Sequence, residues 1–300
     1  MVLAEGASES VLEFFLYDSV KILVLLWLMV FAIGVVRTYI PQKKIRGWLS
    51  GRYGISYVAA AFFGAVTPFC SCSSIPLFIG FIKAGAPLGS AFTFLVASPL
   101  INEYLVVLML GFFGLKVTVA YIVTGLLLAI VSGLVISRLN MERYLVEGMQ
   151  AQEARENSVG YKELKKRVVF GVHEANDIVS SLWKWVLLGV GVGAVIHGFI
   201  PQAVIDGAVA AAGVFAVPIV VAIGVPMYAN CAAVLPIAAA LFEKGVPLGT
   251  ALAFMMSTAA LSLPEAIILR RVMRIQLILT FFGIVALGII IIGYLFNMLV

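Results

Sequence analysis

Residues 85–94 read GAPLGSAFTF, and residues 245–254 read GVPLGTALAF. A second pair of similar stretches precedes them, with IPQKKIRGWL at residues 40–49 and IPQAVIDGAV at residues 200–209. Both pairs are separated by about 160 residues, and self-similarity at one fixed spacing is the mark of an internal duplication. This spacing, called the repeat offset below, divides the chain into two related halves.

The composition predicts an all-α polytopic membrane protein. Hydrophobic residues make up 63% of the chain and charged residues only 12%, whereas soluble domains contain about a quarter charged residues. In so apolar a chain, a duplicated half is typical of transporters whose substrate site lies between two repeats near the bilayer midplane. The excess of Lys and Arg lies in a few short loops, where it sets topology. We therefore expect a lipid bilayer and no nucleic acid as partner.

Six apolar stretches approach or exceed the roughly 20 residues that a helix needs to cross a bilayer. They are Ser19–Tyr39, Pro87–Phe113, Val117–Ser137, Ile178–Phe199, Pro247–Leu269 and Ile275–Met298. The first is preceded by acidic residues and followed by no small-residue cleavage site, so it is interpreted as a membrane helix and not as a signal peptide.

The distribution of basic residues predicts the topology. Lys and Arg cluster at 43–52, 138–167 and 270–274, whereas the N-terminus is acidic and the turn at 200–207 has no base. By the positive-inside rule, the three basic segments are cytoplasmic and both chain ends lie outside an inner cell membrane. The two halves are then inserted in opposite orientations, as an inverted repeat. The predicted parts are a first repeat (1–137), a polar cytoplasmic linker (138–177) and a second repeat (178–300).

Two further apolar segments, Tyr53–Ile82 and Gly207–Phe242, are interrupted by prolines and small polar residues. Irregular backbone at membrane depth is tolerated only where it is buried in protein or lines a cavity. We therefore expect broken or re-entrant helices at the centre, which give either three or five crossings per half. The predicted backbone breaks are Pro68, Pro76, Pro99, Asn102, Pro226 and Pro236.

All three cysteines lie in these interrupted segments. Residues 67–76 read TPFCSCSSIP, and the matching stretch at 225–236 reads VPMYANCAAVLP. Thiolates are preferred ligands of soft centres, so converging thiols would suit trivalent arsenic or a soft metal ion. The plainer alternative is that each cysteine is a small buried hydrophobic residue. The residues predicted to contact substrate are Cys70, Ser71, Cys72, Ser73, Asn230 and Cys231.

Two acidic residues follow polar breaks in otherwise apolar sequence. Residues 98–103 read SPLINE and residues 261–265 read LSLPE, ending in Glu103 and Glu265. An ionisable group inside a membrane segment is costly and is by default a functional candidate. Each would carry a proton or balance the charge of a cationic substrate. The alternatives are an ion pair of Glu265 with Arg270 or Arg271, and pairing of Glu103 with another helix.

The stretches 67–76, 84–89 (AGAPLG) and 98–103 resemble the predicted permease family that includes organoarsenical efflux permeases of the ArsP type and YraQ-type proteins. This resemblance implies an inner-membrane permease that exports trivalent methylated or aromatic arsenicals in exchange for protons, without ATP hydrolysis. It also implies that thiols recognise the substrate. Cys70 and Cys72 match the first motif directly, whereas no second motif of this kind surrounds Cys231.

We therefore expect a permease, not an enzyme, that exports a small thiophilic solute by alternating access with proton coupling and without a cofactor. An alternative from another class is a membrane thiol oxidoreductase that uses the Cys70-x-Cys72 pair, whose disulfide would be strained and labile. A channel or assembly subunit is a third possibility. The identity of the solute and the oligomeric state stay open, a homo-oligomer being one possible form.

Overall fold

The computed structural model describes residues 54–67, 71–83, 85–146, 165–173, 213–226, 245–270 and 272–299. It also describes scattered residues between 16 and 35, between 175 and 187 and between 234 and 242. All structural statements below refer to these residues.

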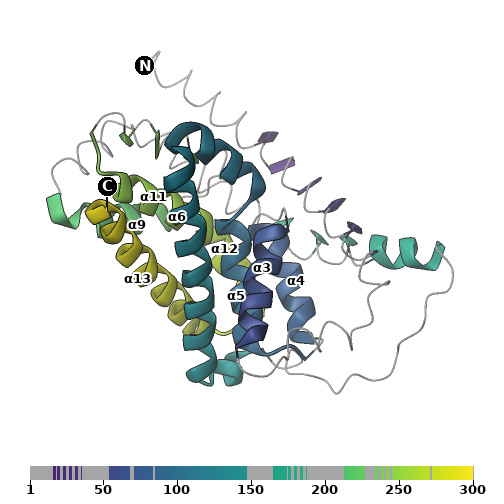
Figure 1. Cartoon of the computed structure of the whole chain (residues 1–300). Helices are drawn as coiled ribbons and strands as arrows, with labels where there is room; N and C mark the ends of the chain where they lie inside the picture. Colours follow the sequence, from purple (N-terminus) through teal and green to yellow (C-terminus); the bar gives the residue numbers. More distant parts are fainter. Residues whose placement is uncertain are drawn as a thin grey trace, which may run out of the picture.

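The described residues form helices and no strands, which confirms the all-α class; their one β-bridge pairs Leu145 with Met273. The α-helices are α3 (Ile55–Val66), α4 (Ser71–Lys83), α5 (Leu88–Leu100), α6 (Glu103–Arg138), α9 (Ala216–Gly224), α11 (Leu248–Ala260), α12 (Leu263–Leu269) and α13 (Ile275–Leu299). Two short 3₁₀ turns are η1 (Met141–Tyr144) and η2 (Gly213–Phe215). In Figure 1, α3, α4 and α5 lie on one side of α6, and α9, α11 and α13 lie on the other.

Three described segments are long and apolar enough to cross a membrane: Leu105–Arg138, Leu248–Leu269 and Ile275–Leu299. The expected uninterrupted spans Pro87–Phe113 and Pro247–Leu269 are each divided by a short break, after α5 and after α11. A helix of 13 residues such as α5 is about 20 Å long, which is less than the hydrocarbon thickness of about 30 Å. Neither α5 nor α11 therefore crosses the bilayer alone.

The duplicated stretches at 85–94 and 245–254 form the same turn. Gly85 and Gly245 have φ values of 78° and 91°, a left-handed conformation that glycine adopts without steric cost. In each turn the glycine N–H and the next N–H bond back to the preceding helical segment, as in Ala86 N to Phe81 O at 2.9 Å and Val246 N to Leu241 O at 3.0 Å. This is the Schellman pattern. A proline then precedes the next helix, so the sequence GxPLG encodes a helix–turn–helix corner in both halves.

The close contacts of three pairs of equivalent glycines repeat between the halves. There is no room for a side chain at Gly89 or Gly249. A Cβ atom added to Gly89 would collide with the Gly133 carbonyl, and a Cβ atom added to Gly249 would collide with the Gly293 carbonyl. These pairs are related by the repeat offset and bring α5 onto α6 and α11 onto α13. In the same way, a Cβ atom added to Gly64 of α3 would collide with Ala97 and Ser98 of α5.

Its counterpart, Gly224 on α9, meets Ser257 and Thr258 of α11, which are the residues equivalent to Ala97 and Ser98. The helix groups α3–α5–α6 and α9–α11–α13 are therefore packed alike, and the duplication seen in the sequence extends to the close contacts of the fold.

The helices α5 and α11 form the centre of the molecule. All 13 residues of each helix are buried, and the two helices contact each other. Aromatic rings close the core around α5: Phe92 lies 5.0 Å from Phe78 and 5.0 Å from Phe281 of α13, measured between ring centroids. The outer helices α6 and α13 carry exposed Leu, Ile and Val residues along their free faces, such as Leu127 and Ile291. Such faces suit contact with lipid.

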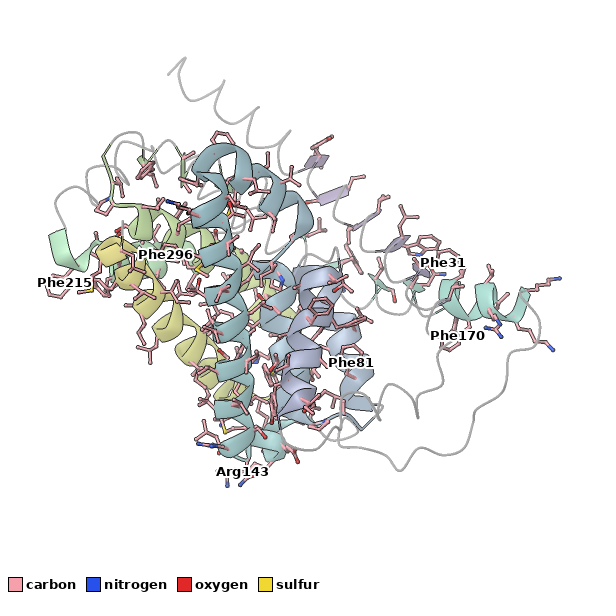
Figure 2. The ribbon with its side chains drawn as sticks, viewed as in Figure 1. Phe31, Phe81, Arg143, Phe170, Phe215 and Phe296 are labelled. Carbon is pink, nitrogen blue, oxygen red and sulfur yellow. The ribbon has the colours of Figure 1, made fainter. Side chains whose placement is uncertain are left out.

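Helix α6 consists of two parts, because Gly114 has φ 74° and ψ 176° inside it. The part after Gly114 begins at Leu115, which is equivalent to Ile275 at the start of α13. These equivalent segments lie side by side and run in opposite directions. Figure 2 shows Arg143, just beyond the end of α6, at the opposite end of the pair from Phe296 near the end of α13.

The start of the linker is tied to the corner between α12 and α13. Arg274 N donates to Tyr144 O at 2.8 Å, and Val146 N donates to Val272 O at 3.0 Å. We call this pairing of residues 144–146 with residues 272–274 the linker strap. It joins the start of the linker to the second half, at the end of the molecule that carries Arg138, Arg143, Arg270 and Arg274.

Candidate functional site

The breaks after α5 and α11 have the same geometry. Ile101 (φ −120°, ψ 88°) ends α5, and Leu261 (φ −133°, ψ 98°) ends α11. Each residue still donates its N–H to a carbonyl in the last turn, and both are buried. The next helix begins directly afterwards, after Asn102 in the first half and after Ser262 in the second. The chain therefore changes direction inside the protein at two equivalent, buried points.

Pro99 lies inside a helix, and not at the break that follows it. Pro99 is part of α5, which ends at Leu100. The carbonyl of Leu100 accepts a hydrogen bond of 3.0 Å from the hydroxyl of Tyr121, a fully buried residue of α6. This bond holds the end of α5 and was not expected from the sequence. Phe281, at the equivalent position, has no hydroxyl to offer.

Helix α4 continues through Pro76, so the irregular backbone expected between Pro68 and Pro76 is not present from Ser71 onward. Pro76 has no N–H to donate to the carbonyl of Cys72, four residues earlier. Loss of one helical hydrogen bond is tolerated here because the turns around Pro76 are firmly packed: Ser74, Ile75 and Phe78 are fully buried. The backbone of α4 therefore offers a carbonyl group without its helical donor at the cysteine position.

Several predicted site residues lie outside the described residues: Pro68, Cys70, Asn230, Cys231 and Pro236. The backbones of Ser71, Cys72 and Ser73 form the first turn of α4, but their side chains are outside the description. Pro226 is exposed in a turn after α9. Convergence of the three thiols therefore stays a prediction. Among the described residues, no group of three or more His, Cys, Asp or Glu side chains could hold a metal ion.

The two acids differ in position. Glu103 is the first residue of α6, and its side chain lies outside the description. Glu265 is the third residue of α12 and is only 1% exposed. At the repeat offset, Glu265 matches Leu105 and Glu103 matches Leu263. The acids expected to form a duplicated pair are therefore not equivalent residues.

The carboxylate of Glu265 has no hydrogen-bond partner among the described residues. Its backbone N–H donates to the hydroxyl of Ser262, the N-cap of α12, at 3.3 Å. Ser262 and Glu265 have the spacing of a capping box, in which the acid would bond back to the N-cap N–H. Here the carboxylate does not do so. Arg270 is exposed at the end of α12, and the alternative of an ion pair between it and Glu265 is not present. Arg271, the other partner considered, lies outside the described residues.

Each segment that follows a break contacts the proline-containing segment of the other half. Helix α12 contacts α4, and Figure 1 shows α12 near the middle of the molecule. In the reciprocal position, Phe113 of α6 lies 5.9 Å from Phe242, between ring centroids. The candidate site is therefore an interface between the halves, formed by α4, the helix that contains Cys72, and α12, the helix that contains Glu265.

Buried hydroxyl groups on the central helices are a further feature that the sequence reading missed. They occur at equivalent positions, as in Ser90 with Thr250 and Ser98 with Thr258. The signal was present in the sequence, because both members of each pair are polar residues in otherwise apolar helices. These positions mark α5 and α11 as helices that face protein instead of lipid.

Comparison with known proteins identifies the family. The profile of the ArsP_1 family, described as predicted permease, matches residues 8–298. The chain belongs to this family of predicted permeases. It is therefore a multi-pass membrane protein of a transporter family. No solved structure gives a significant match to this permease.

Two curated relatives are similar to this permease. The UPF0718 protein MJ0584 of Methanocaldococcus jannaschii is 22% identical over 298 residues, which covers 80% of this chain and 81% of that protein. A Streptococcus mutans serotype c protein named "Putative two-component membrane permease complex subunit" is 21% identical over 173 residues, covering 57% of this chain and 54% of that protein. Both similarities agree with the family assignment.

Proposed function

We propose that this membrane permease exports a small thiophilic solute, such as a trivalent organoarsenical or a soft metal species, by alternating access coupled to protons. The observation that carries the proposal is the meeting of α4 and α12, which come from different halves. A site formed by two halves can open to either side when one half moves against the other. Family membership supports transport over the thiol oxidoreductase that was the alternative expectation.

The antiparallel arrangement of equivalent helices supports an inverted repeat. The second part of α6 and α13 lie side by side, with the end of α6 near the start of α13. Equivalent segments that run in opposite directions are related by a two-fold axis perpendicular to them. In a membrane protein with helices along the bilayer normal, this axis lies in the membrane plane.

The basic residues at the end of the molecule that carries the linker strap determine the topology that we propose for the chain. Arg138, Arg143, Arg270 and Arg274 all lie near this end, which the positive-inside rule assigns to the cytoplasm. Both chain ends would then be outside the inner membrane, and the linker would be cytoplasmic.

In this proposal the substrate is bound by soft ligands at the start of α4. Cys72 and the carbonyl that Pro76 leaves without a donor are the first candidates, with Cys70, Ser71 and Ser73 beside them in the sequence. Asn230 and Cys231 would come from the second half. A trivalent arsenic centre bonds strongly to thiolates and tolerates oxygen neighbours, so this donor set suits it. Glu103 and Glu265 would supply the proton or counter-charge.

The direct test is uptake into everted membrane vesicles, which reports export from the cell. Methylarsenite, arsenite, Zn(II) and Cu(I) are offered separately, with and without a proton gradient. We expect gradient-dependent uptake of one of them and its loss in the Cys72→Ala variant.

The matched control is Ser132→Ala, which removes a buried hydroxyl without a hydrogen-bond partner among the described residues. This control should transport normally. Normal uptake by Cys72→Ala would overturn the role of the thiol, and absence of uptake of all four solutes would overturn the proposed substrate class.

A further inference from the structure

Among the described residues, Glu265 is the only one with an acidic side chain that is fully buried. Both of its carboxylate oxygens lack a hydrogen-bond partner among the described residues. Burying an ionised carboxylate without a partner is very costly, whereas a protonated carboxyl group is neutral and is tolerated far better. The site therefore favours a carboxyl group that holds a proton.

The equivalent position in the first half shows that the fold does not need an acid here. Leu105 occupies that position and is fully buried in α6. The hydrogen bonds around the two positions are alike, with Val106 N donating to Asn102 O at 2.9 Å and Ala266 N donating to Ser262 O at 3.0 Å. The same corner is thus built once with an apolar side chain and once with a carboxyl group, so the packing of α12 does not explain Glu265.

Helix α4 contacts α12, and its ionisable residues are Cys72 near its start and Lys83 at its end. The central helices α5 and α11 contain no ionisable residue. Tyr294 is the one ionisable residue of α13, and Arg270, which ends α12, is exposed. In the described part of the chain, therefore, no fixed positive charge balances the carboxylate.

We propose that Glu265 alone binds the coupling proton of this permease, and that the first half has no counterpart because Leu105 takes the equivalent position. This inference rests on the proposed transport function and narrows its coupling group from two acids to one. A metal cation is a poorer occupant, because it needs several oxygen ligands at once. Among the described residues, Ser262 has the one hydroxyl that is hydrogen-bonded to Glu265. This hydroxyl already accepts the Glu265 N–H.

Binding of a proton to a carboxylate can be measured without any transported solute. We would record pH-difference infrared spectra of the purified full-length protein in lipid, using the absorption of protonated carboxyl groups. We expect a band from a buried carboxylic acid that is lost in Glu265→Gln, a change that keeps the shape of the side chain. The band should persist in Glu142→Gln, because Glu142 is exposed at η1.

Glu103→Gln separates one carrier from two. Retention of the buried-acid band in this variant supports Glu265 as the sole carrier, and a partial loss equal to that of Glu265→Gln would show two carriers. Retention of the band in Glu265→Gln would also overturn the inference, as would a spectral change that follows Na⁺ at constant pH.

A second arm uses methylarsenite uptake into everted vesicles. Glu265→Gln should lose its dependence on the proton gradient while binding of the solute is kept. If methylarsenite is not transported by the unaltered protein, the proposed substrate class fails, but the infrared result still decides whether Glu265 binds a proton. The two failures are therefore distinguishable.

Discussion

Leu128 of α6 packs against Gly288 of α13, and the two residues occupy equivalent positions in the two halves. An added Cβ on Gly288 would meet the Cδ1 atom of Leu128. If the halves are related by the two-fold axis proposed above, this axis passes between the two residues, because equivalent residues touch across antiparallel helices. Both residues lie near the middle of their segments, Leu115–Arg138 and Ile275–Leu299. The contact is therefore expected at the bilayer midplane.

Exchange of these two residues tests the symmetry. Gly288→Leu alone should lower stability by about 1–3 kcal/mol, because two leucines would compete for one space. Leu128→Gly alone should lower stability because it leaves a cavity and adds a glycine to a helix. The double variant Leu128→Gly/Gly288→Leu should recover most of the loss, since a two-fold axis makes the arrangements alike. Thermal unfolding midpoints in detergent measure this. Additive losses in the double variant would contradict the symmetry.

The close glycine contacts between α5 and α6 and between α11 and α13 predict that alanine substitutions at equivalent positions lower the stability to a similar extent. An added Cβ on Gly89 would meet the Gly133 carbonyl oxygen at 2.5 Å, and one on Gly249 would meet the Asn297 backbone nitrogen at 2.8 Å. Backbone atoms cannot move aside as a flexible side chain can. Gly89→Ala and Gly249→Ala should therefore each destabilise the protein by about 1–3 kcal/mol.

Two helical glycines with open space around them are the controls. Nothing lies within 4 Å of a Cβ added to Gly111 of α6 or Gly283 of α13. Alanine at these positions should leave stability unchanged or raise it by about 0.5–1 kcal/mol, because alanine favours the helix. A loss in the controls equal to that at Gly89 and Gly249 would show that the close contacts are not the cause.

The linker strap can be cut at one hydrogen bond. Val146→Pro removes the N–H that donates to Val272 O. Leu145 already has the extended conformation (φ −71°, ψ 146°) that a following proline requires. The variant should lose about 1 kcal/mol of stability, and the amides of residues 272–274 should exchange hydrogen faster.

Val146→Ala keeps the N–H and is the control. It should change the exchange of these amides little, because the backbone bond is retained. Equal exchange in the proline and alanine variants would mean that the strap does not hold the corner between α12 and α13.

The cap of α12 gives another prediction. Ser262→Ala removes the hydroxyl that accepts the Glu265 N–H, and loss of an N-cap typically costs about 1 kcal/mol. Ser262→Asn should restore most of the loss, since asparagine is also a good cap. Thermal unfolding in detergent compares the three proteins. Equal midpoints for Ser262→Ala and the unaltered protein would show that the hydroxyl does not support α12.

The duplication and the breaks could be predicted because both depend on local sequence. The stretch GxPLG encodes its turn through a left-handed glycine and a following proline, and these are visible without tertiary information. The polar residues at 98–103 and 261–265 likewise marked the points where α5 and α11 end. The equivalence of Glu265 and Leu105 can also be read from the sequence at the repeat offset.

Other features could not be predicted because packing decides them. Apolar sequence predicts burial in either lipid or protein, so Pro87–Phe113 read as one span although α5 is enclosed by other helices. The path of α4 through Pro76 depends on burial of Ile75 and Phe78, which compensates for the missing hydrogen bond. Tyr121 bonds to Leu100 across a long sequence separation that no local pattern signals.

The complete enclosure of α5 and α11 has a consequence for biogenesis. Each helix has 13 residues and is too short to be released into the bilayer as an independent span. Their surroundings include α13, which follows both of them in the chain, so the centre cannot close until α13 has been synthesised. The nascent first half should therefore wait in an open form that holds α5 near the insertion machinery or a membrane chaperone. Chains truncated before Ile275 should be degraded, even though they contain the whole first half.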